Sequence, residues 1–176
     1  MRSVAPVLLL APVVLGLGCD RAPTEPGATV VLDRSVADAA NPERPFNGRC
    51  DTEITILEPL EGDPPNLLRM HIDYVCQLQH LGRTTAVAEQ IVIFTSPTTQ
   101  TASNTTIYTA ANGDQLFSEW SGTSTSSGPD MTFSGPATFS GGTGRFVNAS
   151  GSAFISGTAS FVTSTGQFTQ EGTLSY

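Results

Sequence analysis

The chain has only two histidines, and His80 is the better placed of the two for chemistry. His80 shares the parity of Tyr74 and Leu78, which are expected to face the interior, and it lies just before Gly82. An imidazole at the mouth of a β domain could exchange protons near neutral pH. The alternative is a structural histidine whose ring hydrogen bond fixes a turn. His71 has the opposite parity and is expected on the solvent face.

Two carboxylates interrupt segments of otherwise small or apolar residues. Glu89 breaks the apolar parity of its segment, and Glu119 directly precedes Trp120. A carboxyl group inside a barrel would have a raised pKa and could act as an acid or base. The alternative is that both point to solvent, because the exterior of the domain also needs charge. The candidate catalytic residues are therefore His80, Glu89 and Glu119, and Tyr74 is a candidate ligand contact.

Other signatures of enzyme chemistry are missing from the sequence. No metal-ligand cluster stands out, and no serine can be singled out as a nucleophile with a nearby histidine and acid. Gly141-Gly142-Thr143-Gly144 has the glycine content of a phosphate-binding loop, but it lacks the lysine and the following helix. A tight turn is expected there instead, and neither a metal nor a cofactor is predicted.

The composition is that of an extracellular β protein. Hydrophobic residues make up 39% of the 176 residues and charged residues only 14%, lysine does not occur, and Ser, Thr and Gly are abundant. These residue types disfavour helices. A net charge of −8 without an arginine cluster argues against nucleic acid as a partner. The length suffices for one folded domain after a leader and a stalk.

Residues 1–18 have the layout of a secretory signal peptide, with Arg2 followed by an apolar run. That run is shorter than the roughly 20 apolar residues of a membrane span. Its end, Leu15-Gly16-Leu17-Gly18-Cys19, resembles the lipobox of bacterial lipoproteins, although Gly16 stands where that family prefers leucine. The resemblance implies acylation of Cys19 and anchoring to a membrane. The alternative is an ordinary secretory leader with an incidental cysteine.

Residues 19–45 are predicted to be the lipidated N-terminus and a flexible stalk, because this stretch contains several prolines and charges of both signs and has no sustained periodicity. Residues 46–176 form the predicted domain. Three cysteines occur in the chain. With Cys19 assigned to lipid, Cys50 and Cys76 remain as a pair, and an oxidising compartment would let them form a disulfide.

Apolar residues at every even position from Leu68 to Leu78, with mostly polar residues between them, predict a half-buried strand with its even positions inward. Upstream, Ile54 and Ile56 share the parity of Cys50, and a loop rich in proline and acidic residues separates the two segments. An antiparallel register centred on this loop pairs residues whose numbers sum to 126. It sets Cys50 opposite Cys76, with both thiols facing inward.

Further strands follow along the chain. Thr84 to Thr95 has apolar residues on both parities, which predicts a strand covered on both faces along part of its length. Asn112-Gly113 predicts a two-residue hairpin turn that pairs Thr109 with Leu116. Later strands are expected at Met131 to Phe139, Ser152 to Ser156, Thr158 to Thr163 and Gln167 to Tyr176. This pattern predicts an all-β barrel or sandwich, and closure into a single antiparallel barrel would remove exposed edges.

Gly141 to Phe146, followed by Ala149 and Gly151, is similar to the glycine-rich turn of dirigent proteins and allene oxide cyclases, which share an eight-stranded antiparallel barrel. Three further segments extend the resemblance to a group of uncharacterised secreted bacterial proteins of that type: His80-Leu81-Gly82-Arg83, Ala110-Ala111-Asn112-Gly113-Asp114 and Gly172-Thr173-Leu174-Ser175-Tyr176. The resemblance implies a barrel of about eight strands. Its motifs concern turns and packing, so no catalytic residue is carried over.

Three functions agree with these observations. The first is a non-enzymatic envelope lipoprotein, in the periplasm or on the cell surface, that binds a small apolar ligand or an envelope protein. The second is a cyclase- or isomerase-type enzyme that uses polar residues at the barrel mouth. The third is a purely structural surface module. The lack of a catalytic constellation favours the first.

Overall fold

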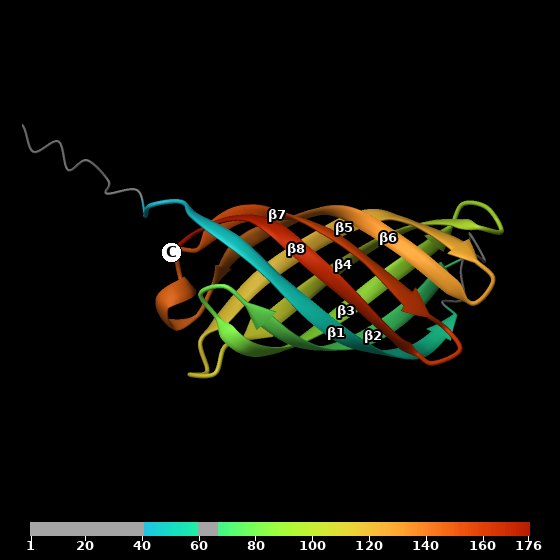
Figure 1. The fold of residues 1–176 in the computed structure, drawn as a ribbon, viewed down its shortest axis with the longest axis horizontal. Helices are drawn as coiled ribbons and strands as arrows, with labels where there is room; N and C mark the ends of the chain where they lie inside the picture. The colour runs from blue at the N-terminus through green and yellow to red at the C-terminus, as the bar shows by residue number, and fades with distance from the viewer. Residues whose placement is uncertain (1–40, 60–66) are drawn as a thin grey trace, which may run out of the picture. The chain divides into compact units, whose positions relative to one another are not determined.

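The computed structural model describes residues 41–59 and 67–176, with the backbone alone for residues 56–59 (Figure 1). The predicted signal peptide, Cys19 and most of the predicted stalk lie outside the described residues. The first strand begins at Arg44, so the barrel starts two residues before the predicted boundary at residue 46.

Eight antiparallel strands form one closed barrel in which β1 pairs with both β2 and β8 (Figure 1). The expected all-β barrel of about eight strands is confirmed, and among the described residues the helical content is the single 3-10 turn η1, Gly144–Phe146. The strands are β1 Arg44–Pro59, β2 Leu67–Leu78, β3 Gly82–Phe94, β4 Thr99–Thr109, β5 Gln115–Ser127, β6 Asp130–Gly142, β7 Ser150–Ser160 and β8 Thr165–Ser175.

The register between β1 and β2 agrees with the prediction. Ile54 pairs with Ile72 and Cys50 with Cys76, as expected for partner numbers that sum to 126. Along β2 every even residue from Met70 to Leu78 is buried, because successive side chains of a strand point to opposite faces. The apolar parity of this sequence therefore marks the lumen of the barrel.

The predicted register of the β4–β5 hairpin is wrong by one residue. Thr109 pairs with Gln115 rather than with Leu116, and Leu116 pairs with Tyr108. The loop has three residues instead of two, because the Ala110 amide bonds the Asp114 carbonyl, and Gly113 adopts φ +88°. Three-residue hairpin loops commonly end with a glycine in this left-handed conformation. The shift places Tyr108 and Leu116 together inside the barrel.

Two other expectations for the strands are also wrong. Gly157 does not divide two strands, because β7 runs through it from Ser150 to Ser160. The outer face of β3 is not covered, since Val87 and Ile93 are 43% and 37% exposed. The apolar residues on the outer parity of β3 therefore belong to the barrel surface.

Large side chains close one end of the barrel, where the β2–β3, β4–β5 and β6–β7 connections lie. Leu116, Phe146 and Leu174 are each 0% exposed. The Phe46 and Phe139 rings meet edge to face at 4.9 Å. Arg145 links two of the connections through its hydrogen bond to the His80 carbonyl at 2.8 Å. This packing confines any internal space to the opposite half of the barrel.

Candidate functional site

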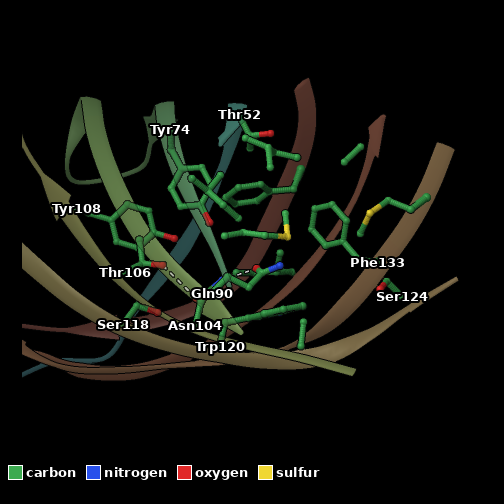
Figure 2. Close-up of a pocket in the computed structure, with 18 residues that line it drawn as sticks. Thr52, Tyr74, Gln90, Asn104, Thr106, Tyr108, Ser118, Trp120, Ser124 and Phe133 are labelled. Carbon is green, nitrogen blue, oxygen red and sulfur yellow. Dashed lines mark hydrogen bonds between the residues drawn. The ribbon is translucent and has the colours of Figure 1, made fainter. Parts of the chain in front are cut away.

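A cavity of about 50 Å³, whose lining residues are drawn in Figure 2, lies in the half of the barrel away from this packed end. Its walls come from inward-facing positions on all eight strands, so only closure of the sheet creates it. The lining residues are Thr52, Ile54, Met70, Ile72, Tyr74, Gln90, Ala102, Asn104, Thr106, Tyr108, Ser118, Trp120, Ser124, Met131, Phe133, Ile155, Ala159 and Phe168.

Much of the cavity wall is apolar and aromatic. The Trp120 and Phe133 rings pack edge to face at 6.1 Å, and the Tyr74 and Phe168 rings do so at 5.4 Å. The indole Nε1 of Trp120 donates a hydrogen bond to the Gly135 carbonyl at 3.1 Å. The indole is thus held in place by its one polar atom, and part of its ring lines the cavity.

Neighbouring strands β3 and β4 supply a polar strip on another part of the wall. The Asn104 amide donates to Gln90 Oε1 at 3.1 Å, and the Thr106 hydroxyl donates to Asn104 Oδ1 at 3.1 Å (Figure 2). Buried polar groups of this kind are stable only when hydrogen-bonded. The strip is therefore an ordered row of uncharged donors and acceptors.

The hydroxyl groups of Tyr74, Tyr108 and Thr106 gather at the inner end of the cavity (Figure 2). Burial raises the pKa of the Tyr74 phenol far above its ordinary value, and the nearby Tyr108 adds to the rise. Burial likewise raises the pKa of Tyr108. Both phenols therefore keep their protons at any physiological pH and act as hydrogen-bond donors.

Gln170 lies beyond these hydroxyls on β8 and is 1% exposed. The amide is close enough to the Tyr108 hydroxyl to oppose the rise in the tyrosine pKa. Nevertheless, neither Oε1 nor Nε2 of Gln170 meets the geometry of a hydrogen bond. An unpaired buried polar group typically costs about 1–3 kcal/mol of stability. Such a group needs an explanation in structural or functional terms.

The size of the cavity limits what can enter without rearrangement. A dry apolar cavity of roughly 150 Å³ accommodates benzene. The present volume of about 50 Å³ is a third of that, so it accepts only a slender group of a few non-hydrogen atoms. Met70 and Met131 line the cavity, and methionine side chains rearrange easily, so these two residues are the natural points of expansion.

His80 does not lie at an open mouth. It occupies the β2–β3 turn at the packed end, with a left-handed φ of 70°. Its Nε2 lies 2.9 Å from the Pro45 carbonyl oxygen, and its ring contacts the Tyr176 ring at 5.8 Å. These contacts agree with the structural alternative, in which the histidine fixes a turn.

The two candidate carboxylates are both on the outside of the barrel. Glu89 and Glu119 are exposed and flank Thr105 on the outer faces of β3, β4 and β5. Neither can act as an acid or base inside the lumen. Glu89 instead pairs with His71, whose Nδ1 lies 2.7 Å from Glu89 Oε1 on the outer surface, as expected for the parity of His71.

Tyr74 is the candidate residue that does line the cavity. Sequence reasoning missed its polar neighbours Gln90, Asn104, Thr106 and Gln170. The available signal was their even numbering, which places them on the inward face of their strands. That signal does not single them out, because Ser, Thr, Asn and Gln occur on both faces of these strands. Among the described residues, no cluster of three or more His, Cys, Asp or Glu side chains could hold a metal ion.

Comparisons with models of protein families, with curated proteins and with solved structures find no match for this chain. The similarity to allene oxide cyclases and dirigent proteins therefore stays a prediction from its turn motifs. Among the described residues, no helix has the length and apolar character needed to cross a membrane.

Proposed function

We propose that this protein is an exported bacterial envelope lipoprotein whose barrel binds a small, mainly apolar molecule in its lumen. The observation that carries the proposal is the cavity, which combines apolar and aromatic walls with a short strip of ordered polar groups. Small-molecule sites in proteins typically have this composition. The polar strip would orient the ligand, and the apolar walls would supply most of the binding free energy.

Export and anchoring rest on the leader and on the cysteines. The lipobox-like end of the leader supports acylation of Cys19. Cys50 and Cys76, which are at disulfide distance, are compatible with folding in an oxidising compartment. Anchoring through a lipid on a stalk would keep the barrel at a membrane surface, where apolar molecules are concentrated.

A purely structural surface module is the second candidate, and the small volume of the cavity favours it. A barrel lumen can be filled by side chains alone. The enzyme alternative loses the support that it drew from Glu89 and Glu119, because both residues are exposed on the exterior. The two candidates differ in one measurable respect. A binding protein takes a molecule from solution into its lumen and releases it again, whereas a structural module does not.

Trp120 makes that measurement direct, because it is the single tryptophan of the chain and lines the cavity. Titration of the exported protein with 2-hexanone, a slender apolar ketone that enters once the Met70 and Met131 side chains move aside, should change Trp120 emission in a saturable way. Ala102→Leu, which fills the cavity from β4, should abolish the change. Ser103→Leu adds the same side chain at the next, outward position and should leave binding intact.

The same variants show whether a loss of binding is specific. Far-UV circular dichroism and thermal unfolding must show that Ala102→Leu still folds. Ala159→Leu fills the cavity from β7 and offers a second test. Native mass spectrometry of protein from its own host should reveal a retained molecule. If 2-hexanone causes no saturable change and no molecule is retained, the lumen is packing alone and the structural module stands.

A further inference from the structure

We propose that the outside of the barrel carries a second binding site, a groove across β3, β4, β5 and β6 that holds an uncharged glycan of β-linked pyranose rings. The groove has a volume of about 530 Å³. The exposed ring of Phe154 on β7 would form its stacking platform at one end. This site lies on the outer face of the sheet, so the inference does not depend on what the lumen binds.

One bank of the groove is a polar row built by strand pairing. Neighbouring members of such a row are about 4.7–4.9 Å apart, because that is the spacing between adjacent strands. The bank therefore offers one hydroxyl or one carboxylate at every strand. From β3 to β6 its members are Glu89, Thr105, Glu119 and Thr138, each directly opposite the next.

The other bank lies two residues along each strand, roughly 6.4–6.8 Å away, and is partly apolar. Its members from β3 to β6 are Ile91, Ser103, Ser121 and Pro136. Pro136 pairs with Phe154 on the next strand, and the Phe154 side chain is 56% exposed. The groove thus runs between a polar bank and a bank that ends in an apolar platform.

The polar groups of the groove are available to a ligand. His71 Nδ1 lies 2.7 Å from Glu89 Oε1 and so holds that carboxylate in place. Within residues 41–59 and 67–176, no hydrogen bond or ion pair occupies the Glu119 carboxylate or the hydroxyls of Ser103 and Ser121. Ionised carboxylates only accept hydrogen bonds, so they suit a ligand that is rich in O–H donors.

A β-linked glycan matches this combination of groups. A pyranose ring carries hydroxyls around its edge and C–H groups on its faces. Its edge can donate hydrogen bonds to the carboxylates, while a face lies against the Phe154 ring. The β linkage gives an extended ribbon whose single ring is about as long as the spacing between neighbouring strands. Successive rings can therefore meet successive strands in the same way.

The charge of the groove disfavours an anionic polymer. Glu89 and Glu119 would repel it, and neither lysine nor arginine is among the lining residues. Arg69, which pairs with Ile91, lies beyond the lining on β2. A basic peptide would be attracted to the two carboxylates but would leave the row of hydroxyls unmatched. It is the alternative that the experiment has to exclude.

Calorimetric titration of the exported protein with three hexamers tests the site. Cellohexaose, an uncharged β-linked glucan, should bind in a saturable way. The β-linked glucuronate hexamer has the same backbone with a carboxylate on each ring, and it should not bind at concentrations that saturate the protein with cellohexaose. Hexalysine is the probe for a basic peptide and should bind more weakly than cellohexaose at physiological salt.

Two exposed residues can be removed to locate the binding. Phe154→Ala should lower the affinity for cellohexaose by roughly 10-fold, because it removes the apolar platform. Glu119→Ala should have a similar effect, because it removes a charged acceptor. The matched controls are Val75→Ala and Glu53→Ala, which change an exposed apolar side chain on β2 and an exposed carboxylate on β1. Both controls should leave the affinity unchanged.

A pair of leucine substitutions separates the groove from the lumen. Ser103→Leu narrows the groove from β4 and should weaken cellohexaose binding while the Trp120 response to 2-hexanone is retained. Ala102→Leu fills the lumen and should have the opposite effect on the two ligands. Far-UV circular dichroism and thermal unfolding must show that both variants fold.

Each contrary result overturns the proposal in a recognisable way. If cellohexaose does not bind to the wild type, the glycan site is wrong whatever the outcome with 2-hexanone. If hexalysine binds and cellohexaose does not, the groove recognises a basic peptide. Cellohexaose binding that is unchanged in Phe154→Ala and Glu119→Ala, or that is lost only in Ala102→Leu, places the glycan elsewhere.

Discussion

Cys50 on β1 faces Cys76 on β2 directly across the sheet, with the Cα atoms 4.0 Å apart and the sulfur atoms at bonding distance. Both residues are almost fully buried. The pair lies within the first hairpin of the barrel and closes a loop with a sequence separation of 26 residues. A cross-link of this length restricts the unfolded chain and so favours folding.

Replacing both cysteines with alanine is expected to lower the free energy of unfolding by roughly 2–4 kcal/mol while the barrel stays intact. Urea unfolding followed by Trp120 fluorescence measures the loss, and far-UV circular dichroism checks the fold. Wild-type protein treated with a reductant is the matched control and should lose a similar amount. Two free thiols in exported protein that is denatured without reductant would contradict the bridge.

Cys19→Ser is expected to release the protein from membranes or to block its maturation, because serine cannot take the thioether-linked lipid. Membrane fractionation and electrophoretic mobility provide the measurement. The double variant Cys50→Ser and Cys76→Ser retains Cys19 and should stay in the membrane fraction. A Cys19→Ser protein with unchanged fractionation and mobility would refute lipidation.

The Glu89 carboxylate, through its hydrogen bond, raises the pKa of His71 above its ordinary value, and Asp73 contributes to the rise. Because the folded-state pKa is raised, protonated His71 stabilises the protein below about pH 6.5, and this contribution disappears as the pH rises through the raised pKa. Glu89→Gln should therefore lower stability at pH 5.5–6 and have little effect at pH 9.

The loss is expected to be at most about 1 kcal/mol, because the pair lies on the surface. NMR titration should show the pKa of His71 falling in Glu89→Gln. Glu119→Gln, an exposed carboxylate on the outer face of β5, is the control and should not move it. An identical His71 titration in wild type and Glu89→Gln would show that the contact does not form in solution.

Tyr74 and Tyr108 are expected to remain protonated in the folded barrel above pH 10, because burial raises the pKa of both phenols. A raised folded-state pKa means that stability is retained below about pH 10 and declines at higher pH, where the unfolded chain loses phenol protons more readily. Phenolate absorbance from these residues should appear only together with unfolding.

Spectrophotometric titration of the wild type, Tyr74→Phe and Tyr108→Phe measures this effect. Each variant should lose one tyrosine from the fraction that ionises on unfolding. Ionisation of all three tyrosines before any change in circular dichroism would contradict the buried positions.

The two hairpins show how far local pattern carries a prediction. For β1 and β2, long apolar alternation and two cysteines both required the same register, and the structure has it. For β4 and β5, a single Asn-Gly signal indicated the turn but not its length. One added loop residue moved the register by one position and put Tyr108 inside with Leu116. A register error of one residue exchanges the two faces of a strand.

The sequence by itself determined the inward parity and the register of β1 and β2 and the cysteine pair, because side-chain alternation with period 2 is a local property of the chain. Tertiary structure alone decided that Glu89 and Glu119 are outside and that Gln170 is buried without a partner. The tertiary structure also decided that a cavity exists, because its walls come from all eight strands. Its volume depends on how side chains from opposite sides of a closed sheet meet across the lumen, and no local pattern encodes that distance.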